Sequence, residues 1–300
     1  MSRGEDLLQT LWGGYGKLLR RTTPDGTTRI VKDVRWPEGK ADRSHARKLR
    51  SYEVEARWYA TWRDLAPTGC RLPRCLGHET RRDGMVLVLE DLDAAGYSRR
   101  SSLRRKDELQ AALAWLARFH ANFLGVAPDG LWKEGSYWHL ATRPDELEAM
   151  PRGPLRDAAP ELDRRLSRAR FRTLVHGDAK PDNICLSSRG EVAFVDFQYV
   201  GGGCGMRDVA YLLDCVHDED FGGSATLEAL DHYFRALRTS LTPAFAPLAD
   251  EIEAEGRALL PVAWLDYQRF LQGWSPAYAR PSARLARRLR ETLDLLAIST

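Results

Sequence analysis

One short segment of the chain concentrates side chains that could do chemistry. This segment, HGDAKPDN at residues 176–183, supplies a carboxylate (Asp178), an ammonium group (Lys180) and an amide (Asn183). A second carboxylate, Asp196, follows thirteen residues after Asn183 in the apolar sequence VAFVDFQ. A base, a cation and two oxygen ligands are the components that phosphoryl transfer requires.

The apolar runs around these residues predict how they come together. Residues 184–186 and 192–195 are typical of two short strands, and SSRG between them is typical of a turn, because glycine readily adopts a positive φ. The resulting hairpin places Asn183, at the start of one strand, beside Asp196, at the end of its partner. Two converging oxygen ligands suit a hard cation such as Mg²⁺. Asp178, on the loop just before, is placed to take a proton from a hydroxyl near that metal.

This stretch closely resembles the catalytic loop and metal-binding aspartate of the protein-kinase-like superfamily. With Gly177 after the histidine, the stretch resembles the small-molecule branch of this superfamily. That branch comprises aminoglycoside phosphotransferases, choline kinases and ecdysteroid-kinase-like proteins. The resemblance implies ATP as the phosphate donor. It implies a catalytic base (Asp178), a cation facing the γ-phosphate (Lys180), two Mg²⁺ ligands (Asn183 and Asp196) and two structural supports of the loop (His176 and Asp208).

Residues 5–34 predict three strands, at 7–12, 17–21 and 28–34, with GGYG (Gly13, Gly14 and Gly16) between the first two. A glycine-rich hairpin can lie close over phosphates because no Cβ blocks the approach. GGYG alone is also compatible with an ordinary turn. Its position just before the strand that carries Lys32 favours a nucleotide-binding loop.

A helix capped by Ser44 and running to about Leu65 is expected next. Glu55 falls within its apolar arc. A carboxylate on a buried face requires a cation, and Lys32 in the apolar strand RIVKDV is the natural partner. In kinase-like folds such a pair orients the lysine onto the α- and β-phosphates. The alternative is an exposed glutamate and a lysine at a strand edge.

Farther along, MVLVL at 85–89 predicts a strand that ends in Glu90-Asp91-Leu92. By resemblance, Glu90 and Leu92 belong to a hinge whose backbone groups bind adenine.

Residues 107–124 predict a helix, with His120 as a core histidine. The triple glycine at 201–203 leads to Asp208 and a helix that starts near Val209. Residues 225–296 are expected to be helical, with three aromatic residues of the core (Trp264, Tyr267 and Trp274).

The expected fold is α+β: a two-lobed protein-kinase-like fold. Residues 1–92 form a small N-lobe, an antiparallel sheet with one helix, that binds the nucleotide. Residues 93–300 form a larger, mainly helical C-lobe that contains the catalytic loop, the metal site and the acceptor pocket.

Composition narrows the class of protein. The 300 residues are 43% apolar and 29% charged, which is typical of a soluble globular protein. No run of about 18 apolar residues exists, so no membrane partner is expected. The first residues lack the apolar core of a signal peptide, which favours the cytoplasm. Five cysteines without CxxC spacing indicate reduced thiols. A net charge of +3 gives no case for nucleic acid. The sequence does not predict the oligomeric state.

The acceptor is expected to be a small molecule. Only eleven residues separate Asp196 from Asp208, and four of them are glycine, which leaves little room for the platform of a protein Ser/Thr kinase. Gly177 also stands where many protein kinases carry an arginine. Choline-like, amino-sugar-like and sterol-like alcohols are candidates. An acidic run could attract a cationic alcohol or be a solvated helix end (Asp214, Asp218, Glu219 and Asp220).

Two readings from other classes compete with the kinase. One is a catalytically inactive nucleotide-binding regulatory module, and the other is a metal-dependent hydrolase that uses His176 and Asp178. The sequence departs from the family pattern at two positions, and both bear on which subfamily it resembles. Lys180 stands where histidine is commoner among the aminoglycoside enzymes, and DFQ replaces DFG.

Overall fold

The computed structural model describes residues 4–39, 42–217, 221–275, 277–278 and 280–298. By its internal contacts the chain divides into two compact units. Unit 1 consists of Met1–Ser101 and Asp182–Gln198, and unit 2 of Ser102–Pro181 and Tyr199–Thr300. The secondary structure is mixed, with a five-stranded antiparallel sheet in unit 1 and mostly helices in unit 2, which confirms the α+β class.

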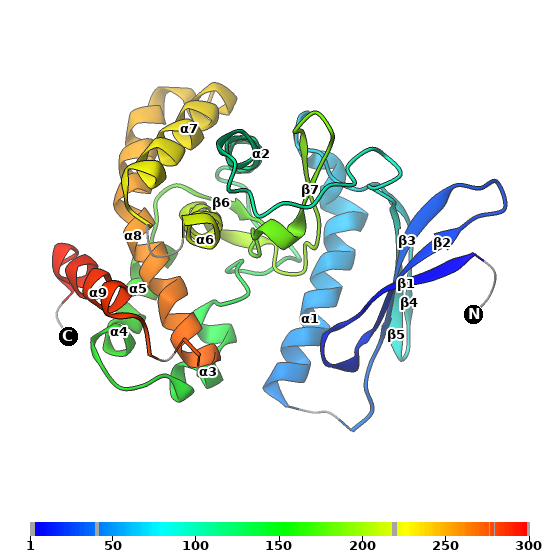
Figure 1. Ribbon diagram of the computed structural model, residues 1–300, viewed down its shortest axis with the longest axis horizontal. Coiled ribbons are helices and arrows are strands. Elements are labelled where there is room, and N and C mark those ends of the chain that lie inside the picture. The colour runs from blue at the N-terminus through cyan, green and yellow to red at the C-terminus, as the bar shows by residue number, and fades with distance from the viewer. Residues whose placement is uncertain (1–3, 40–41, 218–220, 276, 279, 299–300) are drawn as a thin grey trace. The chain divides into compact units, whose positions relative to one another are not determined.

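The sheet of unit 1 has the strand order β1-β2-β3-β5-β4 (Figure 1). Its strands are β1 Glu5–Thr10, β2 Gly16–Thr22, β3 Thr28–Arg35, β4 Cys75–Arg81 and β5 Gly84–Glu90. Four of them confirm the predicted strands, although β1 begins and ends two residues earlier than predicted, and β4 was not predicted. β3 is central, because its residues pair with β2 on one side and β5 on the other. Lys32 therefore lies in mid-sheet, opposite Leu18 and Leu87.

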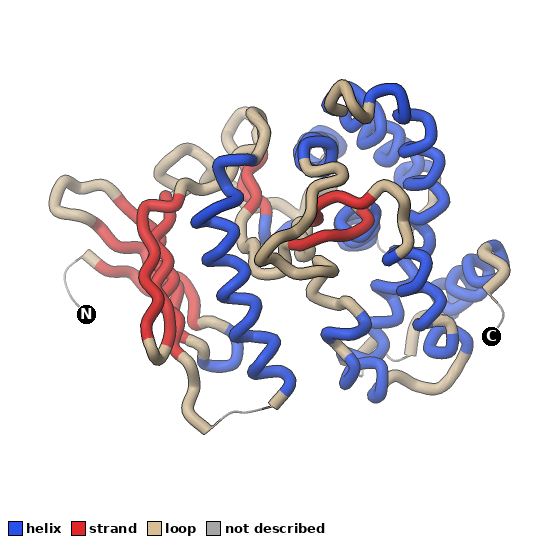
Figure 2. The backbone as a smooth tube through the Cα atoms, turned by 180° about the vertical axis from the view of Figure 1, so that it is seen from behind, coloured by secondary structure: helices blue, strands red, loops and turns tan. Residues whose placement is uncertain are grey.

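Helix α1, Arg43–Arg57, lies beside this sheet in both backbone views (Figures 1 and 2). The predicted cap was wrong: Asp42, not Ser44, caps the helix, because its carboxylate accepts the His45 N–H at 2.7 Å. The helical path continues through a π turn at Trp58–Trp62 and a 3₁₀ turn at Arg63–Leu65. The expected end near residue 65 is thus correct, although only the first part is α-helical.

The second part of unit 1 is the hairpin of β7 (Ile184–Leu186) and β8 (Val192–Phe194). The two strands are antiparallel, with Ile184 opposite Phe194. The Ser187 hydroxyl accepts the backbone N–H groups of Arg189 and Glu191, and Gly190 has a φ of +80°. The hairpin and its turn confirm the prediction.

Unit 2 contains most of the helices. Their bounds are α2 Lys106–Asn122, α3 Pro144–Ala149, α4 Pro154–Asp157, α5 Ala159–Ser167, α6 Met206–His217, α7 Ser224–Ser240, α8 Ala249–Trp274 and α9 Ala283–Leu295. Helix α7 packs on α2, and α6 packs on α8. Trp264 and Tyr267 of α8 are buried, as predicted. Trp274 at the end of α8 is 48% exposed, so its assignment to the core was wrong.

Two strands complete unit 2: β6 (Arg172–Val175) and β9 (Gly201–Cys204) pair antiparallel. The triple glycine leads into a helix with Asp208, as expected, and itself forms most of β9, which was not predicted. Close packing requires glycine in this strand, since a Cβ on Gly201 would lie 2.2 Å from the carbonyl oxygen of Trp132. Helix α6 consequently begins at Met206, slightly earlier than the predicted start near Val209.

Within the described residues, no helix is both long enough and apolar enough to span a bilayer.

All five cysteines of the chain are free thiols, as predicted.

Candidate active site

The residues singled out in the sequence fall into two groups. The glycine loop, Lys32, Glu55, Glu90, Leu92, Asn183 and Asp196 lie in unit 1. His176, Asp178, Lys180 and Asp208 lie in unit 2. Pro181 and Asp182 connect Lys180 to Asn183 along the chain.

Lys32 of β3 and Glu55 of α1 form a buried ion pair. The Lys32 Nζ lies 2.7 Å from the Glu55 Oε2, and the side chains are only 7% and 2% exposed. Burial acts to lower the pKa of Lys32, but the negative charges of Asp196 and Glu55 outweigh it and raise that pKa above its ordinary value. Burial also raises the pKa of Glu55 to about 7, although Lys32 opposes this shift. Lys32 is therefore a fixed cation at neutral pH.

Asp196 lies beside this pair. Its Oδ1 is 3.3 Å from the Lys32 Nζ, and its side chain is 34% exposed. Its φ is +66°, a left-handed conformation that aspartate adopts more readily than most residues. Such conformations cluster at functional sites. Because the Val195 N–H donates to the Asn183 carbonyl at 3.0 Å, Asn183 and Asp196 come from adjacent strand ends, as the hairpin predicted.

The glycine loop joins β1 to β2. The Leu11 N–H donates to the Gly16 carbonyl at 2.8 Å, and the Gly14 N–H donates to the Leu11 carbonyl at 3.2 Å. Gly16 is required by the sheet, because a Cβ there would lie 2.0 Å from the Asp33 carbonyl oxygen. A Cβ on Gly14 would meet nothing within 4 Å. The backbone at Gly14 is therefore open to close approach.

Glu90 and Leu92 follow the end of β5. Glu90 forms an ion pair with Arg71 at 2.8 Å, so its carboxylate is already bound by a residue of the protein. Leu92 is buried in a small apolar cluster with Cys185 and Ala193 of the β7–β8 hairpin. These contacts join the predicted hinge to the hairpin that carries Asn183.

The loop before Asp178 is supported by the buried carboxylate of Asp208 in unit 2. Its Oδ2 accepts the His176 N–H at 2.6 Å, and its Oδ1 accepts the Gly177 N–H at 2.9 Å. The buried His176 ring in turn accepts the Asp178 N–H through Nδ1 at 3.3 Å. Gly177 has a φ of +81°, and a Cβ there would lie 2.2 Å from the Tyr199 carbonyl oxygen. The local backbone thus requires glycine at residue 177.

Asp178 and Lys180 lie close together on this loop. The Lys180 Nζ is 3.3 Å from the Asp178 Oδ2, and the two side chains are 34% and 9% exposed. The Lys180 N–H also donates to the Asp178 carbonyl at 2.9 Å. The loop thus carries a largely buried carboxylate next to a partly exposed cation.

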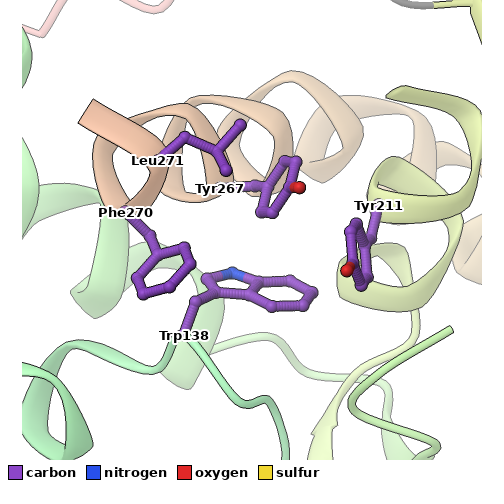
Figure 3. Packing of buried hydrophobic residues seen from close by; sticks show 5 residues of the cluster. All are labelled: Trp138, Tyr211, Tyr267, Phe270 and Leu271. Atoms are coloured by element: carbon purple, nitrogen blue, oxygen red, sulfur yellow. The ribbon is translucent and has the colours of Figure 1, made fainter. Parts of the chain in front are cut away.

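Two tyrosines, Tyr137 and Tyr211, lie close enough to Asp178 to be affected by its charge. The Tyr137 N–H donates to the Gly177 carbonyl at 3.0 Å, which ties Tyr137 to the loop. Burial, with the Asp178 carboxylate as the next contribution, raises the pKa of both Tyr137 and Tyr211. Tyr211 also belongs to an aromatic cluster with Trp138, Tyr267, Phe270 and Leu271 (Figure 3). Tyr211 was not identified from the sequence, because its position in α6 matches an ordinary core residue.

One member of the acidic run, Asp214 of α6, is half-buried in unit 2. Its Oδ1 accepts the Trp264 Nε1–H at 2.7 Å and the Gln268 Nε2–H at 2.8 Å. Asp214 is therefore not a solvated helix end. The other three members, residues 218–220, lie outside the described residues.

The donors in unit 1 fit a hard divalent cation. Asn183 supplies an amide oxygen and Asp196 a carboxylate, both from strand ends that a backbone hydrogen bond holds together. These oxygen donors are the kind that Mg²⁺ prefers, since it is usually bound by one or two carboxylates and completed by phosphates and water.

Comparison of the sequence with family models identifies the chain as a phosphotransferase. The model described as the phosphotransferase enzyme family matches residues 8–249. The chain belongs to this family, whose members are kinases. This assignment confirms the resemblance to small-molecule kinases of the protein-kinase-like superfamily.

Solved structures share the fold at low sequence identity. Amicoumacin kinase hAmiN matches with a TM-score of 0.63 and 17% identity, covering 98% of this chain and 89% of that chain. Plasmodium vivax ethanolamine kinase has a TM-score of 0.58 and 13% identity, over 98% and 83% of the chains. An aminoglycoside-3'-phosphotransferase of type VIII has a TM-score of 0.53 and 20% identity, over 86% and 93%. No curated protein matches the sequence.

Proposed function

We propose that this protein is an ATP-dependent phosphotransferase that moves the γ-phosphate of Mg·ATP to a hydroxyl group of a small molecule. The observation that carries the proposal is the set of Lys32, Glu55 and Asp196, in which one lysine lies within 3.3 Å of both carboxylates. Burying Lys32 and Glu55 is costly, so a purely structural role accounts poorly for this pair. A triphosphate with its metal would use the lysine and the second carboxylate directly.

In this proposal residues 1–92 form the nucleotide-binding lobe and residues 93–300 form the lobe with the catalytic loop and acceptor pocket. Lys32, held by Glu55, binds the α- and β-phosphates of ATP. The open backbone at Gly14 allows the loop to cover the phosphates. Amicoumacin kinase hAmiN, which shares the fold, was solved with AMP-PNP and Ca²⁺, and this supports a nucleotide and a divalent cation as ligands here.

Asn183 and Asp196 would hold Mg²⁺, and when bound the ion would neutralise charge on the β- and γ-phosphates. Asp178 accepts or orients the proton of the acceptor hydroxyl, since a positioned carboxylate can serve as a general base. Lys180, 3.3 Å from Asp178, provides positive charge for the transferring phosphoryl group.

The acceptor is proposed to be a small alcohol that binds near Asp178, Tyr137 and Tyr211. Amino-sugar-like and choline-like alcohols are favoured, because the solved structures that share the fold include an aminoglycoside phosphotransferase and an ethanolamine kinase. A positively charged group on the acceptor would be attracted to carboxylates such as Asp178 and to aromatic faces.

The test is ADP release by the purified protein with Mg·ATP and a panel of choline analogues, amino sugars, sterols and nucleosides. A kinase releases ADP only when one of these alcohols is added. Equal ADP release without any alcohol would identify a hydrolase, and nucleotide binding without ADP release against the whole panel would favour the inactive regulatory module. The Asp196→Ala variant is the control for contaminating ATPase, since it should retain the fold and lose Mg²⁺-dependent turnover.

A further inference from the structure

Gln198, the last residue of the DFQ triplet, is buried and makes three side-chain hydrogen bonds within unit 1. Its Nε2 donates to the Asp196 Oδ1 at 2.8 Å. Its Oε1 accepts from the Lys48 Nζ at 2.9 Å and from the Ser51 Oγ at 3.1 Å. An amide oxygen only accepts and an amide nitrogen only donates. Because the Lys48 ammonium group can only donate, its bond to Oε1 fixes the orientation in which the NH₂ group faces Asp196.

The two residues that anchor Gln198 lie on the same helix as Glu55. Lys48, Ser51 and Glu55 of α1 are spaced three and four residues apart, which places them along one face of the helix. This face holds Lys32 through Glu55 at 2.7 Å and holds Asp196 through Gln198. One rigid helix thus sets the positions of the phosphate-binding lysine and of the metal-binding carboxylate.

The conformation of Asp196 requires such support. Its φ of +66° lies in a region that non-glycine residues occupy at an energetic cost, and only when the surroundings hold them there. Phe197 provides part of this support, since its ring stacks on Trp58 with centroids 4.7 Å apart and planes 7° from parallel. Gln198 provides the contact that reaches the carboxylate itself.

We propose that Gln198 is a positioning residue for the metal site: its amide holds the Asp196 carboxylate so that Oδ2 is presented to the divalent cation. The Oδ1 of Asp196 is already engaged, since it accepts from the Lys32 Nζ at 3.3 Å and from the Gln198 Nε2 at 2.8 Å. A glycine at residue 198 would leave Asp196 without this bond. The inference rests on the proposed function, because it concerns the metal that ATP brings.

The experiment measures Mn²⁺ affinity by electron paramagnetic resonance in the presence of a non-hydrolysable ATP analogue. Gln198→Met keeps the length of the side chain and removes all three hydrogen bonds. Loss of such a supporting contact typically weakens metal binding about 10–100-fold, and that loss is expected here. Lys48→Met should give a smaller loss in the same direction. It should add little to Gln198→Met, because Lys48 acts through the glutamine.

A matched control separates positioning from general destabilisation. Gln268 of unit 2 is also buried and donates its Nε2–H to a carboxylate, the Asp214 Oδ1, at 2.8 Å. Gln268→Met should lower the melting temperature and leave Mn²⁺ affinity unchanged. The proposed role of Gln198 is overturned if Gln198→Met and Lys48→Met bind Mn²⁺ as tightly as the wild type, and Lys48→Met decides alone if the first variant does not fold. Absence of Mn²⁺–nucleotide binding in the wild type would instead overturn the proposed function.

Discussion

The Nε2 of His120 lies 3.1 Å from the Oδ2 of Asp208, the carboxylate that accepts the backbone N–H groups of the loop before Asp178. The other ring nitrogen of His120 is 2.8 Å from the Tyr233 hydroxyl. The histidine was predicted to be a core residue with satisfied hydrogen bonds, and the structure confirms this. Through these contacts His120 of α2 and Tyr233 of α7 are connected to Asp208, which supports the loop before Asp178.

His120→Ala should therefore destabilise the protein. It leaves the buried Asp208 and Tyr233 each without one partner, at a cost of about 1–3 kcal/mol. Urea unfolding measures the loss. His232→Ala on α7 is the control, since His232 is only partly buried and should matter less. Equal unfolding free energies for the two variants would contradict this role of His120.

Lys32→Met should weaken ATP binding severely and also destabilise unit 1. The buried Glu55 loses the partner that lies at 2.7 Å, and removing one partner of a buried pair typically costs about 3–5 kcal/mol. Calorimetric titration with Mg·ATP and thermal unfolding give the two effects. Lys17→Met, an exposed lysine on neighbouring β2, is the comparison. ATP affinity equal to that of the wild type would exclude Lys32 from the nucleotide site.

Glu55 should make stability depend on pH. Its pKa is raised in the folded protein from 4.5 to about 7, so between these values the folded state holds a proton that the unfolded state releases. The contribution of Glu55 to the free energy of unfolding is therefore higher at low pH, and it falls as the pH rises from 4.5 to about 7.

Urea unfolding at several pH values should show this slope in the wild type, and Glu55→Gln should lose it. Glu53→Gln, an exposed residue of the same helix, should keep it. An unchanged slope in Glu55→Gln would mean that another group is responsible.

Gly14 and Gly26 allow a matched test of the glycine loop. Both have a φ of +82°, and a Cβ on either would meet nothing within 4 Å. Alanine at either position should cost about 1–2 kcal/mol of stability, from the left-handed backbone alone. Only Gly14→Ala should also weaken ATP binding, because Gly26 lies in the β2–β3 turn. If both variants lost ATP affinity to the same extent, or if neither lost any, the result would argue against a phosphate-binding role for the loop.

Asp178→Asn should lower turnover of a verified acceptor by about 10²–10⁴, the usual cost of losing a positioned general base. ATP affinity should stay nearly the same, since Asp178 is proposed to face the acceptor. Asp182→Asn, an exposed aspartate of the same motif, should have little effect on either. Turnover at the wild-type rate in Asp178→Asn would refute the proposed mechanism.

The sequence by itself determined the local features of this protein. The β7–β8 hairpin and the strand that carries Lys32 follow from short apolar runs and turn residues, which act over a few positions. The pairing of Lys32 with Glu55 was also predictable, because two opposite charges on apolar faces must neutralise each other when buried.

Only the tertiary structure decided the features that depend on contacts between distant segments. The triple glycine became a strand because it pairs with β6, from an earlier segment of the chain. Trp274 remained largely exposed at the end of α8, although the Tyr278 ring stacks on it with centroids 6.2 Å apart. Gln198 appeared in the sequence as a departure from the family pattern. Its hydrogen bonds to Asp196 and to helix α1, 147 residues earlier at Ser51, arise from packing that periodicity does not encode.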